Sequence, residues 1–144
     1  MSLMIDEPKF NELCRLIGLA TLMSQKIQFA LAHYHAFHKM VYIGMTKERA
    51  QQAIADSLKK TLGGVISEVK KETPLGELLA EKLDAFLKER NWLAHSFDHE
   101  ATPIIAAGKD FGHFSSRMAG ITKAAHDLMV ELDKVGNTPG REDG

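Results

Sequence analysis

The sequence predicts an all-α protein, an antiparallel bundle of four main helices. Apolar residues recur every three or four positions over long stretches, whereas sustained alternation is scarce and β-branched residues are scattered. Short turns join the helical stretches, which favours antiparallel neighbours. The 144 residues suit one domain. We expect that domain over residues 4–136, with a cloning scar at 1–3 and a disordered tail at 137–144.

The first predicted helix runs from about Pro8 to about Val41. Its apolar seam steps by fours and threes through Met23, Ile27, Ala30, Tyr34, Phe37 and Val41. A helix of some thirty residues is about 50 Å long, more than a small domain needs. A kink near Gly18, or an overhang used by a second subunit, accounts for the excess.

The second predicted helix begins after Thr46, a suitable N-cap residue, and proceeds to Leu58. The pair Gly63-Gly64 is expected to break it. A short continuation then carries the apolar residues Val65, Ile66 and Val69.

The third predicted helix starts with Thr73 as N-cap and Pro74 as first helical residue, and runs to about His95. The segment 96–112 is expected to be a loop because it contains Pro103 and two glycines. A fourth helix follows from Asp110 or His113 to Val135. Its apolar positions are Met118, Ile121, Ala125, Leu128 and Leu132, and Gly136 is predicted just after its end.

The composition excludes several classes of protein. With 18 basic and 19 acidic residues the net charge is −1, so no extended basic surface for nucleic acid is indicated. The single cysteine, Cys14, allows no internal disulfide, and we expect it to be buried in a reducing compartment. No apolar run approaches the roughly 18 residues of a membrane span, and no signal peptide opens the chain. We therefore expect a cytoplasmic protein.

One arginine interrupts the apolar face of the third predicted helix. With Phe86 at zero on a helical wheel, Leu83 lies near +60°, Leu93 near −20° and Arg90 near +40°. A buried guanidinium needs a partner because it keeps its charge. Arg90 either extends along its stem to solvent, pairs with a buried carboxylate, or lies at an interface that leaves a polar cleft for an anion.

His95 follows Arg90 on the same helix, but about 140° away on the wheel. Asn91, four residues before His95, shares its side of the helix. Arginine and histidine therefore converge only if the helix ends at about Ala94 or if the arginine bends round.

The run Arg90-Asn91-Trp92-Leu93-Ala94-His95 resembles the R-x4-6-H signature of HEPN domains, α-helical bundles of prokaryotic toxin–antitoxin and defence systems. The motif is six residues long, whereas the similarity in architecture covers nearly the whole chain. The resemblance implies a metal-independent endoribonuclease that acts as a homodimer. In that case Arg90 and His95 are the catalytic pair, Asn91 is a substrate-binding companion, and no cofactor is needed.

The resemblance also implies an RNA substrate and an antitoxin or nucleotidyltransferase partner. One family variant, R-x4-6-H-x-Y, carries a tyrosine that such a nucleotidyltransferase modifies. Phe97 stands at that position here and has no hydroxyl, which argues against that modification.

The chemistry of RNA cleavage suits these side chains. Histidine titrates near pH 6.5 and can act as base or acid at neutral pH. Arginine offers a planar, permanently charged fork for phosphate oxygens. Two copies of each in a dimer allow one histidine to act as base and the other as acid.

Two alternatives remain open. Many HEPN domains are non-catalytic, so the chain can instead be a HEPN-like dimer that binds RNA, a nucleotide or a protein partner. It can also be a structural bundle in which Arg90 is tied to an acidic residue of its own chain.

Other residues give weaker signals. His33, His35 and His38 are expected to be partly exposed at a helix end rather than metal ligands, because only two of them share a face. His99 and Asp98 are expected in the loop near the cleft. Trp92 is expected to pack against the first helix or a partner subunit. We expect no metal site.

Overall fold

The computed structural model describes residues 7–141, with the side chains of 7–135. The described chain is helical with no strand, which confirms the predicted all-α class. It forms α1 (Glu7–Ile43), α2 (Lys47–Leu58), α3 (Leu62–Glu72), α4 (Glu77–His95), α5 (Phe97–Ala106) and α6 (Gly112–Arg141). None of the described helices is long and apolar enough to cross a membrane.

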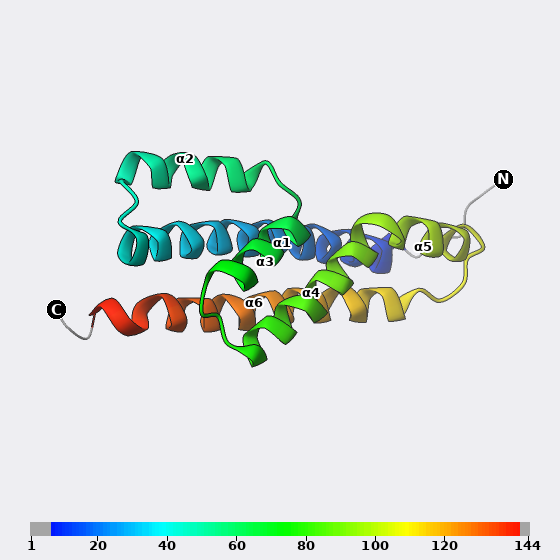
Figure 1. Ribbon diagram of the computed structural model, residues 1–144. Coiled ribbons are helices and arrows are strands. Elements are labelled where there is room, and N and C mark those ends of the chain that lie inside the picture. Colours follow the sequence, from blue (N-terminus) through cyan, green and yellow to red (C-terminus); the bar gives the residue numbers. More distant parts are fainter. Residues whose placement is uncertain (1–6, 142–144) are drawn as a thin grey trace.

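The two longest helices form the frame of the molecule. Figure 1 shows α1 and α6 side by side along the long axis, running in the same direction. α2 runs antiparallel beside α1, α3 and α4 cross the frame, and α5 lies at one end. The expectation of antiparallel neighbours throughout is therefore wrong for the α1–α6 pair, because four intervening helices return the chain to the end where α1 began.

The core lies between the frame and the crossing helices. It takes residues from α1, α3, α4 and α6, among them Leu13, Ile27, Leu31, Val65, Ile66, Leu83, Phe86 and Met118. The apolar positions predicted for the last helix are buried without exception: Met118, Ile121, Ala125, Leu128 and Leu132. Burial of an amphipathic face supplies most of the stability of such helices.

α1 is one helix that continues through Gly18. Of its predicted seam, Ile27 is buried, whereas Phe37 and Val41 are half exposed. The last turn of α1 adds two more exposed apolar residues, Tyr42 and Ile43. The last turns of α1 therefore present exposed apolar side chains, although α2 and α6 lie beside this end of the helix (Figure 1).

The boundary between α2 and α3 lies earlier than predicted. The Thr46 hydroxyl caps α2 as expected, accepting a hydrogen bond of 3.2 Å from the Arg49 amide. The break falls at Lys59–Thr61 rather than at Gly63-Gly64, because Thr61 is a second N-cap and accepts from the Gly64 amide at 3.1 Å. The two glycines lie in the first turn of α3.

The predicted start of α4 at Thr73 and Pro74 is wrong. Thr73 ends α3 instead, and both its amide and its hydroxyl donate to the Val69 carbonyl, at 3.0 and 2.6 Å. α4 starts after Gly76, whose φ of +89° favours glycine. The hydroxyl that was expected to cap α4 is already used by α3.

The segment predicted as a loop contains α5, so that prediction is wrong. Pro103 is the seventh residue of this ten-residue helix. Its ring removes one backbone donor, but burial of Ala101 and the hydrogen bond from Thr102 to Asp98 hold the helix. Gly108 (φ +69°) follows the end of α5, and Gly112 begins α6, so both glycines do mark boundaries.

Two further predictions fail. α6 continues to Arg141, past Gly136, so residues 137–141 of the expected tail are helical; residues 1–6 and 142–144 lie outside the described part. Cys14 is exposed rather than buried. Leu13 takes the core position, and the next residue on a helix points about 100° away.

Candidate functional site

Arg90 lies on the apolar face of α4, as the helical wheel predicts. Leu79, Leu83 and Phe86 are buried along that face, and Arg90 and Leu93 continue it, both partly buried. The apolar stripe therefore runs into a charged side chain near the end of the helix.

A groove of about 210 Å³ surrounds this arginine. It lies between the middle of α1, the end of α4 and the first residue of α5. Its lining is Ile17, Thr21, Ser24, Gln25, Gln28, Arg90, Leu93, Ala94 and Phe97. The lining therefore combines apolar side chains with one guanidinium and with hydroxyl and amide groups.

The guanidinium of Arg90 has no carboxylate partner among the described residues. It donates a long hydrogen bond of 3.4 Å from Nη1 to Oδ1 of Asn91. The adjacent carboxylate, Glu89, is bound by Arg117 of α6 instead. A structural tie between Arg90 and an acidic residue of its own described chain is therefore absent, which removes one of the three sequence interpretations.

His95 does not share the groove with Arg90. It is the last residue of α4, it is exposed, and it is not part of the groove lining. α4 does not end before His95, so the two side chains stay on different sides of the helix. Asn91 accepts from Arg90, and no hydrogen bond joins it to His95 in the described structure.

Trp92 packs against α5 and α6. Its indole nitrogen donates to Glu100 at 2.5 Å, and the Arg117 guanidinium lies 3.6 Å from its ring centroid. Phe97 and Phe114 complete this aromatic cluster at ring-centroid distances of 5.6 and 6.3 Å from Trp92. Trp92 therefore joins three helices.

The three histidines of α1 have different surroundings. His33 is exposed, whereas His35 is buried and lies 3.4 Å from Glu72 of α3, so partial exposure was wrong for His35. Burial lowers the pKa of His35, and the charge of Lys39 lowers it further. No group of three or more His, Cys, Asp or Glu in the described part of the chain is placed to hold a metal ion.

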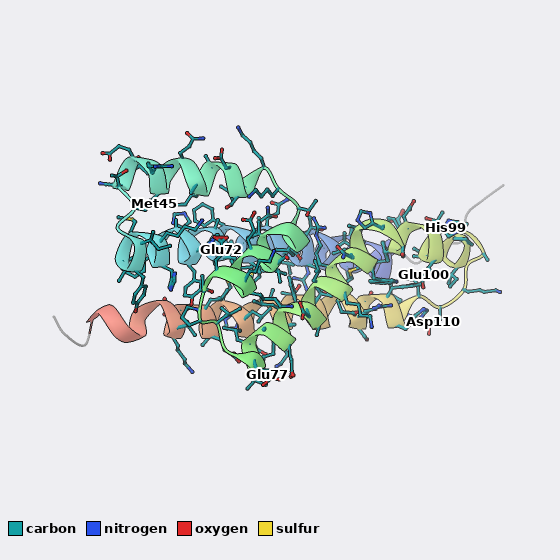
Figure 2. All side chains as sticks on the ribbon, in the orientation of Figure 1. Met45, Glu72, Glu77, His99, Glu100 and Asp110 are labelled. Atoms are coloured by element: carbon teal, nitrogen blue, oxygen red, sulfur yellow. The ribbon has the colours of Figure 1, made fainter. Side chains whose placement is uncertain are left out.

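The residues expected near the cleft from the following segment are on α5. Figure 2 shows His99 and Glu100 at the α5 end of the molecule, with Asp110 nearby and Glu72 closer to the middle. Asp98 accepts a hydrogen bond of 2.8 Å from Thr102 within α5. Neither His99 nor Asp98 lines the groove that contains Arg90.

A larger groove, of about 480 Å³, lies between α4 and α6. Phe86, Ile121 and Leu128 form its apolar floor. The cations on its rim are already paired, Arg117 with Glu89 and Lys82 with Glu131. Of these two grooves, the smaller one holds a cation without a carboxylate partner in the described chain.

Sequence reasoning missed the contribution of α1 to the smaller groove. Thr21, Ser24, Gln25 and Gln28 follow the i, i+3, i+4, i+7 spacing of one helix face, so they form a polar stripe on one side of a largely apolar helix. That spacing was the available signal. The role of these polar residues depends on the helix that lies opposite them, and only the fold shows that Arg90 of α4 lines the same groove.

We found no match between this chain and a protein-family model, a curated protein or a solved structure.

Proposed function

We propose that this protein is a metal-independent endoribonuclease of HEPN type that acts as a dimer through Arg90 and His95. The observation that supports it is Arg90, a partly buried residue that lines a groove of mixed polar and apolar side chains and has no carboxylate partner in the described chain. A cation in that position favours an anionic ligand, because nothing in the described chain neutralises it. The motif resemblance adds a role in a prokaryotic toxin–antitoxin or defence system to the proposal.

In the proposed reaction the 2′-oxygen of a ribose attacks the adjacent phosphorus. One histidine removes the 2′-hydroxyl proton as the new P–O bond forms, and a second histidine protonates the departing 5′-oxygen as the old bond breaks. The products are a 2′,3′-cyclic phosphate and a 5′-hydroxyl. Arg90 stabilises the charge that develops on the phosphorane oxygens.

The geometry of the single chain makes the second subunit part of this proposal. His95 lies outside the groove of Arg90, so one chain does not present both groups to one phosphate. The proposal therefore requires a two-fold axis that brings the His95 side chains of both subunits, together with Arg90, to one phosphate. Asn91, which contacts Arg90, then positions the guanidinium or binds a phosphate oxygen.

The test is cleavage of single-stranded RNA with divalent metals chelated. The wild-type chain should cleave, and Arg90→Ala or His95→Ala should lower the rate at least about 100-fold while the dimer stays folded. Arg49→Ala and His126→Ala, at exposed positions outside the groove, are the matched controls and should cleave normally. Full activity of both motif variants would contradict the proposal.

A second candidate is supported by the exposure of His95 in the single chain. A HEPN-like dimer that only binds RNA, a nucleotide or a protein needs Arg90 but not His95. RNA binding that depends on Arg90, with no cleavage by the wild-type chain, would favour this candidate.

A further inference from the structure

We infer that the groove between α1 and the end of α4 binds one nucleotide of single-stranded RNA, with Gln25 recognising the base while Arg90 holds the phosphate. This inference rests on the RNA-binding part of the proposed function. It adds a specificity-determining residue from α1, which the arginine–histidine motif does not contain.

The polar groups of the groove fall into two sets. Ser24 donates its hydroxyl to the Ala20 carbonyl at 2.8 Å. Gln28 donates its amide to the carbonyls of Ser57 and Lys60, at 3.2 and 2.7 Å. The donor groups of these two side chains are thus already used in hydrogen bonds within the protein, so few remain for a ligand.

Thr21 and Gln25 form the second set. Both are exposed, both line the groove, and neither side chain makes a hydrogen bond within the described structure. An amide both donates and accepts, so it can read the edge of a base that presents a donor beside an acceptor. Gln25 is therefore the side chain of this groove best suited to distinguish bases.

The apolar residues of the groove lining suit the body of a base. Ile17, Leu93 and Ala94 offer aliphatic contacts, and Phe97 offers part of an aromatic ring. By this kind of measure one bound water needs only about 10–15 Å³, so the groove of about 210 Å³ has room for far more than a lone ion.

A single strand fits this groove better than a duplex. Recognition of RNA bases relies on unpaired nucleotides that leave the stack and meet both an apolar surface and hydrogen-bonding groups. The groove supplies one cation, Arg90, and the chain carries a net charge of −1. Few phosphates are therefore contacted, and for one or two contacts the logarithm of the affinity should fall with the logarithm of salt with a slope of about −0.7 to −1.4.

The experiment measures fluorescence anisotropy of short 2′-O-methyl oligonucleotides, one for each base, which cannot be cleaved by 2′-oxygen attack. The wild-type chain should prefer one base. Gln25→Ala should weaken binding to that base about three- to ten-fold, the effect of one lost hydrogen bond, and should reduce the differences among bases. Gln51→Ala, an exposed glutamine of α2 outside the groove, is the matched control and should bind as wild type.

The outcomes separate this inference from the nuclease proposal. His95→Ala should keep the wild-type base preference, because His95 does not line the groove. If Gln25→Ala removes the preference but no RNA is cleaved, the inference stands and the nuclease proposal fails. If the oligonucleotides do not bind, or if Gln25→Ala binds as wild type, the inference is wrong even where cleavage depends on Arg90 and His95.

Discussion

Glu89 is bound by Arg117 of α6 and not by its neighbour in sequence, Arg90. Two hydrogen bonds of 2.8 Å join the Arg117 Nε and Nη2 atoms to the two carboxylate oxygens. These bonds hold the pKa of the Glu89 carboxyl below its usual value. The pairing connects α4 to α6 and uses the carboxylate that precedes Arg90 in the sequence. The lining of the groove around Arg90 contains no carboxylate.

The first prediction concerns this connection between α4 and α6. Arg117→Ala should lower the free energy of unfolding by about 1–2 kcal/mol, because it removes both the bidentate ion pair with Glu89 and the cation–π contact with Trp92. The value is modest because both ion-pair side chains are 39% exposed to solvent. Arg117→Lys should be intermediate, since lysine keeps the charge but not the planar fork. Urea denaturation of the wild type, Arg117→Ala and Arg117→Lys measures the three free energies of unfolding.

The control for this prediction is Arg15→Ala. Arg15 also forms two hydrogen bonds to one carboxylate, that of Glu12, but on the open surface of α1. Arg15→Ala should leave the free energy of unfolding unchanged within experimental error. If Arg117→Lys were as stable as the wild type, the two-pronged geometry would contribute nothing and this account of the contact would be wrong.

The second prediction concerns pH and His35. Burial lowers the pKa of His35 in the folded state, so the unfolded chain takes up its proton first as the pH falls. Neutral His35 therefore contributes to the free energy of unfolding. This contribution is fully present above the pKa of about 6.5 that histidine has in the unfolded chain, and it is lost as the pH falls from there to the pKa of His35 in the folded state. The slope cannot exceed about 1.4 kcal/mol per pH unit for one proton.

The measurement is urea denaturation at pH 7.5 and pH 5.5. His35→Leu should show a smaller loss of stability between these two pH values than the wild type does. His33→Leu, which removes an exposed histidine two residues away, should keep the wild-type loss. Equal pH dependence in His35→Leu and wild type would show that another group is responsible.

The third prediction uses the two adjacent glycines of α3. A methyl group at Gly63 would meet Leu87 at 3.5 Å, an ordinary contact, so Gly63→Ala should stabilise the protein by about 0.5–1 kcal/mol. A methyl group at Gly64 would lie 3.2 Å from the Thr61 hydroxyl that caps the helix. Gly64→Ala should therefore stabilise the protein less than Gly63→Ala does, or destabilise it. Gly63→Ala should therefore have a higher thermal unfolding midpoint than Gly64→Ala. The reverse order would contradict this prediction.

The sequence predicts best where periodicity alone decides the structure. The apolar face of α4 and the unusual place of Arg90 on it follow from helical spacing, and the structure confirms both. The buried positions of α6 follow in the same way. Long helices whose faces pack against one core leave little room for a different assignment.

The predictions that fail depend on competition between neighbouring segments. Thr73 had the right side chain to cap α4, but the end of α3 uses its hydroxyl. Pro103 suggested a loop, yet the helical positions around it are stabilised by burial of Ala101. Gln25 was missed because its importance depends on facing Arg90, a relationship between α1 and α4 that no local pattern contains.

The central claim is that two subunits build one catalytic site, and mixed dimers test it most directly. Dimers that pair a wild-type subunit with a His95→Ala subunit can be purified through two different affinity tags and assayed for RNA cleavage with metals chelated. If one histidine is the base and its counterpart the acid, removal of either should reduce the rate to about a tenth of wild type or less. Half of the wild-type rate would mean two independent sites, and an active monomer would mean that no shared site exists; either result would contradict the account.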